Sequence, residues 1–256
     1  MCINGVYLNP RDKRRFSVFA KHVGRGINRF NMIEEGDRIL IAVSGGKDSL
    51  ALAAALAERR KWVPIKYSLS AMQIEWREFP LKDGERRAID RYFESLRIPL
   101  YRVKAKIFPD SYEKEFNCYI CSRNRKRIIF SEAEKFGIKK IALGHHMDDI
   151  VETTLINLLF RGEFSTMMPV QEFFGGRMKI IRPMCEVKEG EIDRIATILK
   201  LPVVPVRCPK MGINERNFIR SIIREIERKN KRVKENIYQA PWNIKKEYLP
   251  LYLNEE

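Results

Sequence analysis

Short apolar segments alternate along the chain with longer segments whose apolar residues recur every three or four positions. The apolar segments resemble strands of a sheet buried on both faces, and the periodic segments are typical of helices with one buried face. The pattern predicts strands at 38–43, 65–74, 100–103, 140–143 and 178–181, and helices at 16–30, 49–60, 84–97, 122–136, 148–160, 189–201 and 214–229. The remaining residues to 256 are expected to form a charged, irregular tail.

This alternation predicts an α/β fold with a doubly wound, mainly parallel sheet. We place this domain at residues 36–206, between a basic helical N-terminal segment, 1–35, and a basic helical C-terminal segment and tail, 207–256. Ligands of such sheets bind beyond the carboxyl ends of the strands. Polar residues that directly follow a predicted strand are therefore the first candidates for a functional site.

Composition sets broad limits. The chain has 256 residues, of which 45% are hydrophobic, so it is expected to bury a globular core. The longest apolar run, Leu50–Ala57, is too short to span a bilayer, and no secretory leader is evident. Five cysteines do not make a disulfide scaffold. We therefore expect a cytoplasmic protein that does not associate with a membrane.

Charge points to a partner. The formal net charge is +16, and the excess lies in three blocks: 1–30 with +6, 122–140 with +5 and 207–234 with +7. Such blocks are typical of a surface that contacts nucleic-acid phosphates, although solvated helix faces have a similar composition. The residues that we expect to bind the nucleic acid are Arg14, Arg15, Arg123, Arg125, Lys126, Arg127, Arg220 and Arg224.

The first polar cluster after a strand is Ser44-Gly45-Gly46-Lys47-Asp48-Ser49. Paired glycines let the backbone approach an anion closely, and the N–H groups at a helix start favour phosphate. Lys47 adds positive charge, and Asp48 fits beside phosphate if a cation such as Mg²⁺ bridges the two. The spacing is not that of the Walker loop. The alternative is a glycine turn without a ligand.

The second cluster, Gly144-His145-His146-Met147-Asp148-Asp149, also follows a predicted strand. We expect it to converge with the first cluster on one site. One alternative is a polar turn in which Asp148 caps the next helix. Another is a metal site, although adjacent histidines point in different directions and do not complete one.

A third candidate is the CxxC pair Cys118 and Cys121, with Cys208 farther along. A structural zinc site usually needs two such pairs, and a thioredoxin-type redox pair belongs to a different fold. Isolated thiols such as Cys185 and Cys208 are usually inert and buried. Three thiolates can also hold a [4Fe–4S] cluster and leave its fourth iron open to sulfide. Spacing alone leaves these interpretations open.

Together the three motifs resemble a known family. The first resembles the PP-loop of the ATP-pyrophosphatase superfamily, whose Rossmann-like members bind ATP, transfer AMP to a carbonyl oxygen and release pyrophosphate. The second resembles a signature of PP-loop tRNA thiolases. With CYICSRNRKR at 118–127, Ile181-Arg182-Pro183 and the Cys208 region, the chain resembles the tRNA 2-thiocytidine synthetase family from about Phe16 to Tyr248.

The resemblance implies an ATP-dependent tRNA-cytidine 2-sulfurtransferase. Such an enzyme adenylates the C2 carbonyl of an anticodon-loop cytidine and replaces the oxygen with sulfur, giving 2-thiocytidine. ATP, Mg²⁺ and a [4Fe–4S] cluster are the implied cofactors. The implied partners are tRNA and a sulfur donor such as a cysteine desulfurase, and a homodimer is compatible with the resemblance.

The resemblance also assigns roles to residues. The ATP-binding residues would be Ser44, Gly45, Gly46, Lys47, Asp48, Ser49, Gly144 and His145. The catalytic residues would be Asp48, Cys118, Cys121, Arg125 and Asp149. The iron–sulfur ligands would be Cys118, Cys121 and Cys208, and the Mg²⁺ ligands Asp48 and Asp148.

The sequence departs from the family pattern at two points. The acidic residue expected after the second strand is replaced by the nearby Glu75, and Cys208 stands alone where relatives often have two cysteines. The absence of further cysteine pairs favours the 2-thiocytidine branch over 2-thiouridine synthetases. A lysidine synthetase and a non-catalytic iron–sulfur RNA-binding module are two competing interpretations of the same motifs.

Overall fold

The chain folds around a central parallel sheet. The computed structural model describes residues 2–3, 5–108, 118–205, 207 and 215–249. In this part of the chain the sheet has the order β5-β4-β3-β6-β8-β7, and its first five strands are parallel. The last strand, β7, pairs antiparallel with β8. The bounds are β3 (Arg38–Val43), β4 (Ser68–Trp76), β5 (Leu100–Ala105), β6 (Lys140–Ala142), β7 (Val170–Phe173) and β8 (Met178–Ile181).

The order of the strands creates one reversal point. The chain passes outward from β3 to β4 and β5, and then returns to β6 on the other side of β3. Ile41 of β3 is paired with Ala142 of β6, so the carboxyl ends of these two strands lie side by side. In doubly wound sheets this reversal is where ligands bind. The predicted fold class is confirmed, and the two polar clusters follow the two strands that flank the reversal.

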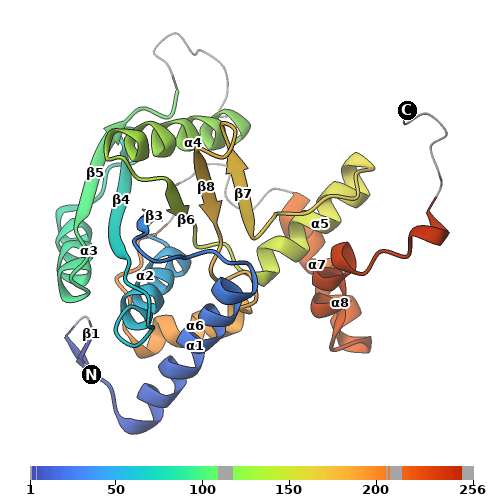
Figure 1. Ribbon diagram of the computed structural model, residues 1–256, viewed down its shortest axis with the longest axis horizontal. Helices are drawn as coiled ribbons and strands as arrows, with labels where there is room; N and C mark the ends of the chain where they lie inside the picture. Colours follow the sequence, from blue (N-terminus) through green and yellow to red (C-terminus); the bar gives the residue numbers. More distant parts are fainter. Residues whose placement is uncertain (1, 4, 109–117, 206, 208–214, 250–256) are drawn as a thin grey trace. The chain divides into compact units, whose positions relative to one another are not determined.

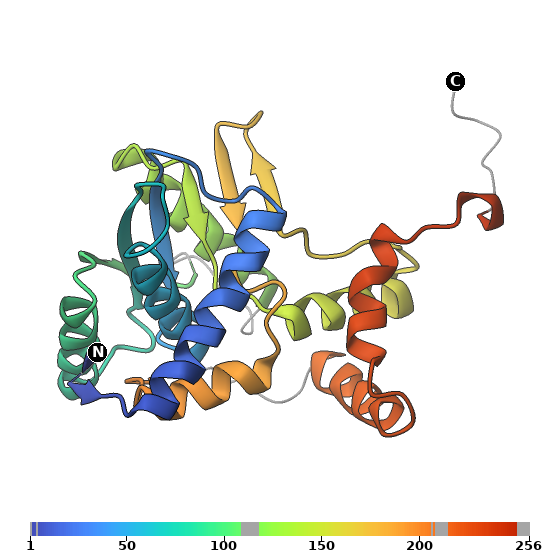
Figure 2. The same ribbon diagram turned by 60° about the horizontal axis from the view of Figure 1, so that its bottom comes forward.

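Helices cover both faces of the sheet because successive β3 residues point to opposite sides. Leu40 belongs to a buried cluster with Ile129 and Ala133 of α4. The other face of β3 contacts α2, which packs against α1 and α6. Figures 1 and 2 show these last three helices grouped on one side of the sheet. The bounds are α1 (Pro10–Arg29), α2 (Lys47–Arg59), α3 (Asp83–Ser95), α4 (Cys118–Lys135) and α6 (Glu189–Ile198).

The chain divides into two compact units. The first comprises Met1–Met147 and Met168–Ile213, and the second Asp148–Met167 and Asn214–Glu256. The N-terminal helix α1 thus belongs to the same unit as the sheet. The boundaries of the two units differ from those of the three segments that we expected from the sequence. The second unit contains α5 (Met147–Arg161) except for its first residue, together with α7 (Glu215–Lys229), α8 (Val233–Gln239) and the 3-10 turns Ala240–Trp242 and Lys246–Tyr248.

Several elements differ from the prediction. The strand at 38–43 has the predicted bounds, but α1 begins six residues earlier because Asn9 caps it, accepting a 2.8 Å hydrogen bond from the Asp12 N–H. The short strands β1 (Cys2–Ile3), β2 (Val6–Tyr7) and β7 were not predicted. The tail expected to be irregular contains α8. No helix among the described residues combines the length and apolar character needed to cross a membrane.

Candidate active site

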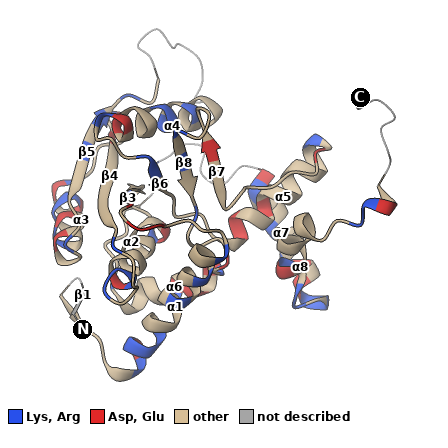
Figure 3. Cartoon of the chain, in the orientation of Figure 1, with Lys and Arg blue, Asp and Glu red and all other residues tan. Residues whose placement is uncertain are grey.

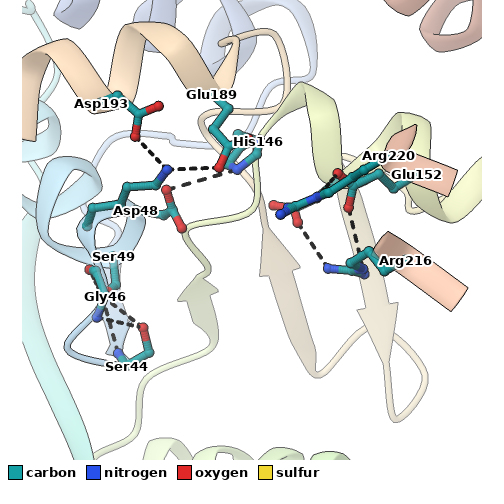
Figure 4. Close-up of polar contacts among 12 residues, drawn as sticks. Ser44, Gly46, Asp48, Ser49, His146, Glu152, Glu189, Asp193, Arg216 and Arg220 are labelled. Atoms are coloured by element: carbon teal, nitrogen blue, oxygen red, sulfur yellow. Dashed lines mark hydrogen bonds and ion pairs between the residues drawn. The ribbon is translucent and has the colours of Figure 1, made fainter. Parts of the chain in front are cut away.

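The loop Ser44–Ser49 forms a tight turn between β3 and α2. Gly45 has φ +84°, a left-handed conformation that favours glycine. The Ser44 hydroxyl accepts a 3.2 Å hydrogen bond from the Gly46 N–H, and the Ser49 hydroxyl donates to the Gly46 carbonyl at 3.0 Å. These bonds tie the turn to the N-terminus of α2 (Figure 4). Because α2 has 13 residues and no side-chain cap, its first N–H groups are suited to an anion.

The two predicted clusters converge. A Cβ atom on Gly144 would lie 2.8 Å from the Ser49 nitrogen and 2.9 Å from the Asp48 carbonyl carbon, so only glycine allows this close approach. His146 is 2% exposed, and its Nε2 lies 4.0 Å from Asp48 Oδ1. The segment 144–146 therefore packs directly on the start of α2, as expected from the sequence.

Arg182 orients His145 beside this loop. Arg182 follows β8 and is buried, and its Nε donates a 3.3 Å hydrogen bond to His145 Nδ1. The guanidinium also donates to the Met168 carbonyl and to Gln171 Oε1. A nitrogen that accepts a hydrogen bond carries no proton, so a neutral His145 bears its proton on Nε2.

Lys47 is paired with carboxylates of α6. Its Nζ lies 2.8 Å from Glu189 Oε1 and 2.5 Å from Asp193 Oδ1 (Figure 4). Burial alone would lower the pKa of Lys47, but the hydrogen bonds to Asp193 and Glu189 raise it above its ordinary value. Lys47, the first residue of α2, is therefore a protonated ammonium at neutral pH.

The aspartates that follow the second cluster are paired within the second unit. Lys234 Nζ lies 2.9 Å from Asp148 Oδ1, and Arg216 Nη1 lies 3.1 Å from Asp149 Oδ1. Arg220 Nε donates to the buried Glu152 at 2.6 Å (Figure 4). Asp148 as a Mg²⁺ ligand and Asp149 as a proton carrier stay predictions. Among the described residues, no group of three or more His, Cys, Asp or Glu is arranged to hold a metal ion.

The CxxC pair lies in the first turn of α4. Cys118 is exposed, and Cys121 is buried. A separation of three residues places both thiols on the same side of the helix, and soft thiolate ligands suit iron–sulfur chemistry. This arrangement fits two ligands of a [4Fe–4S] cluster. The predicted third ligand, Cys208, lies outside the described residues.

Contacts fix the start of α4 near the carboxyl ends of β4 and β5. The Asn124 amide donates to the carbonyls of Lys106 and Ile107 at 2.9 and 3.0 Å, just after β5. The Arg125 guanidinium lies 5.9 Å from the centre of the Trp76 ring, at the end of β4. The predicted substrate residue Arg125 thus has an aromatic contact of its own. Glu75, the departure noted in the sequence, is buried and paired with Arg86.

The predicted RNA-binding residues differ in accessibility. Arg220 is half-buried against Glu152. Figure 3 marks in blue the Lys and Arg positions along α1 and α4 and on the second unit. The exposed members of the predicted set are Arg14, Arg15, Arg123, Arg125, Lys126, Arg127 and Arg224.

Sequence reasoning missed the residues that hold the predicted ones in place. Glu189 and Asp193 are four residues apart on α6, a spacing that marks a pair of carboxylates on one helix face. Arg216, which pairs with Asp149, was also missed and has the same spacing from the predicted Arg220 on α7. The sequence shows these spacings, but it does not show which residues the side chains pair with. Lys47, for example, lies 142 residues from its partner Glu189.

The fold and the loop define a PP-loop protein, and residues 17–226 match the PP-loop domain family. The tRNA-cytidine(32) 2-sulfurtransferases of Herminiimonas arsenicoxydans and Janthinobacterium sp. (strain Marseille) are each 34% identical to the chain, over 92% of it and 74% of their own length. The chain belongs to the tRNA-cytidine 2-sulfurtransferase family of PP-loop proteins.

A solved structure supports the same fold. The U34-tRNA thiolase NcsA from Methanococcus maripaludis, solved with its [4Fe-4S] cluster, superposes with a TM-score of 0.72. The match covers 89% of this chain and 78% of the thiolase, at 22% sequence identity. At this identity the likeness concerns the fold.

Proposed function

We propose that this chain is an ATP-dependent tRNA sulfurtransferase that converts an anticodon-loop cytidine to 2-thiocytidine. The observation that carries the proposal is the convergence of the Ser44–Ser49 loop and the Gly144–His146 turn at the reversal of the sheet. The substrate comes from the relatives, which are tRNA-cytidine(32) 2-sulfurtransferases.

ATP would bind at the start of α2. The N–H groups of the loop and the helix N-terminus would bind the phosphates, and Lys47 would neutralise part of their charge. The C2 carbonyl oxygen of cytosine then attacks the α-phosphorus, forming an O–P bond while pyrophosphate leaves. Catalysis of this step comes mainly from positioning and charge neutralisation. His145, whose Nδ1 accepts a hydrogen bond from Arg182, would donate a hydrogen bond from Nε2 to phosphate, and Asp48 would help to hold Mg²⁺.

Sulfur would replace the activated oxygen in a second step. Sulfide attacks C2, the C–O bond breaks, and AMP leaves with the original oxygen. Cys118, Cys121 and Cys208 would hold a [4Fe–4S] cluster, which supplies an open iron site for sulfide. A persulfide carried on Cys118 or Cys121 is the alternative source of sulfur. Iron content separates the two, because the cluster requires iron in an active preparation made without oxygen.

The tRNA would be held by the exposed basic residues of α1 and α4 and by Arg224. Phosphate contacts fix the position of the RNA without reading its sequence. The target base must leave its stack to reach ATP, which is least costly in a loop. The block on α4 directly follows the CxxC pair, so we expect it to contact the RNA beside the reacting base.

Nucleoside mass spectrometry tests the proposal. tRNA from a strain lacking the gene should lose 2-thiocytidine, and the gene on a plasmid should restore it. A version with Ser44 and Lys47 replaced by alanine serves as the control for catalysis and should not restore it. Loss of 2-thiouridine or lysidine would instead assign the chain to another PP-loop activity. Unchanged 2-thiocytidine would contradict the proposal.

A further inference from the structure

Two carboxylates of α6 form ion pairs with the ammonium group of Lys47. Glu189 and Asp193 lie one helical turn apart, so both reach the same side of α6. Their oxygens lie 2.8 and 2.5 Å from Lys47 Nζ. They therefore take up two of the three donor protons of the ammonium.

This arrangement conflicts with phosphate binding at the loop. Asp48, next to Lys47 in the chain, adds a weaker electrostatic attraction, so the single positive charge of Lys47 is already offset by nearby carboxylates. A triphosphate in the loop would bring further negative charge to the same place. Phosphate oxygens and the α6 carboxylates compete for the ammonium of Lys47, because it carries one charge and two of its three donor protons already point to carboxylates.

The pairing is open to exchange. The side chains of Lys47, Glu189 and Asp193 are 27%, 33% and 55% exposed, so water can replace either partner. Ion pairs at such sites are weak. The four-carbon stem of lysine also lets the ammonium turn from one partner to another.

We propose that Glu189 and Asp193 are positioning residues that hold Lys47 before nucleotide binds and compete with nucleotide phosphate for its ammonium. The inference rests on the proposed ATP site. Binding of ATP would transfer Lys47 from the two carboxylates to the phosphates. Departure of pyrophosphate would return it, so the carboxylates lower affinity and assist product release.

The direct test is the double variant Glu189→Gln with Asp193→Asn, which preserves shape and removes both charges. Isothermal titration with ATP, and separately with pyrophosphate, should show roughly two- to thirtyfold tighter binding, as expected for two weak ion pairs. Pyrophosphate release should slow by a similar factor. The matched control is Glu191→Gln, since Glu191 lies on the same turn but pairs with His22 at 2.8 Å. The control should bind ATP as the wild type does.

A second set of variants separates competition from simple repulsion. With Lys47→Met as the background, removing the two carboxylates should no longer tighten binding, because no ammonium remains to be released. If the gain persists in that background, the carboxylates repel ATP directly and the inference is wrong. Weaker binding in the original double variant also overturns it, since the carboxylates would then orient Lys47 toward phosphate. Asp193→Asn alone, at an exposed side chain, provides the same readout if the double variant fails to fold.

The two proposals fail in different ways. Wild-type protein that binds neither ATP nor pyrophosphate would contradict the proposed function. Wild-type protein that binds both, with the same affinity as the double variant, would contradict the competition for Lys47 alone.

Discussion

Gly144 is the residue at which the two loops of the candidate site touch. In Gly144→Ala, the new methyl group would overlap the backbone of Asp48 and Ser49, at 2.9 and 2.8 Å. Backbone atoms cannot rotate away, so the loop must move. We expect the free energy of unfolding to fall by about 1–3 kcal/mol, the usual cost of overpacking, and ATP binding to weaken. Urea unfolding and calorimetric titration measure the two effects.

Gly190 provides the matched control. It lies in the first turn of α6, and apart from its chain neighbours and the backbone of its own helix no heavy atom lies within 4 Å of the position that its Cβ would take. Gly190→Ala should leave stability unchanged or raise it by roughly 0.5–1 kcal/mol, because alanine loses less backbone freedom than glycine. Wild-type stability and ATP affinity in Gly144→Ala would show that the close approach is not required.

Cys118 and Cys121 give the second prediction for single residues. Replacing either by serine should abolish thiolation, under both the cluster and the persulfide hypotheses, and leave ATP affinity within about twofold of the wild type. The control is Cys185→Ala, at a buried thiol packed near Gly26. It should lower stability by roughly 1 kcal/mol and retain thiolation. Thiolation by Cys118→Ser protein would exclude that residue from the chemistry.

At the scale of elements, ion pairs join α5 and α7. The carboxylate of Glu152 is 2% exposed and lies beside Arg220 and Arg216. Burial raises the pKa of Glu152, and the two arginines counteract this only in part. A raised pKa means that the folded state holds the proton more tightly. The contribution of Glu152 to stability therefore decreases as pH rises from the ordinary glutamate pKa through the raised one.

The raised pKa of Glu152 leads to a prediction for Arg220→Gln. Loss of the guanidinium raises the pKa of Glu152 further, so the variant should be destabilised by roughly 1–3 kcal/mol at neutral pH. The difference from the wild type should shrink in acid, where Glu152 is protonated. Urea unfolding at several pH values measures it. The exposed Arg224→Gln on the same helix should show neither effect. A difference that does not change with pH would contradict the prediction.

Local pattern explains which elements were predicted. Residues 39–43 are continuously apolar, with β-branched side chains at alternate positions, which marked β3 close to its observed bounds. The four residues of β7 are too few and too polar to stand out, and they form a strand by pairing with β8. The start of α1 depends on the Asn9 cap, which precedes the periodic residues. Elements were thus missed where pairing or a cap, rather than periodicity, determines the structure.

The same distinction applies to the site. The loop Ser44–Ser49 and the turn after β6 were predicted because each is a continuous motif at a strand end, and parallel strands bring such ends together. The partners Arg182, Glu189 and Glu152 were missed, because an ion pair between distant positions leaves no local signal. For the same reason Asp148, which the sequence assigned to Mg²⁺, could not be recognised as the partner of Lys234.

At the scale of the whole molecule, the basic residues that give the net charge of +16 lie on several separate helices. On α1, Phe16, Phe19 and Val23 are buried, which leaves the basic residues on the opposite, exposed side. On α7, by contrast, Arg220 neutralises a buried carboxylate. Blocks of similar net charge therefore differ in how many of their basic side chains can reach a polyanion. Those of α1 are more accessible than those of α7.

Replacing Arg14 and Arg15 by alanine should weaken tRNA binding and flatten its salt dependence. Each lost phosphate contact lowers the slope of log K against log[salt] by about 0.7–0.9, so the pair should lower it by roughly 1.5. ATP affinity should stay unchanged, because both residues lie in the exposed first part of α1. The matched control replaces Arg87 and Arg91, exposed on α3, which removes the same charge outside the basic blocks. tRNA binding by the two variants is then measured over a salt series. If the attraction depends only on net charge, both variants lose affinity equally. If α1 forms a defined binding surface, only the variant of Arg14 and Arg15 loses affinity.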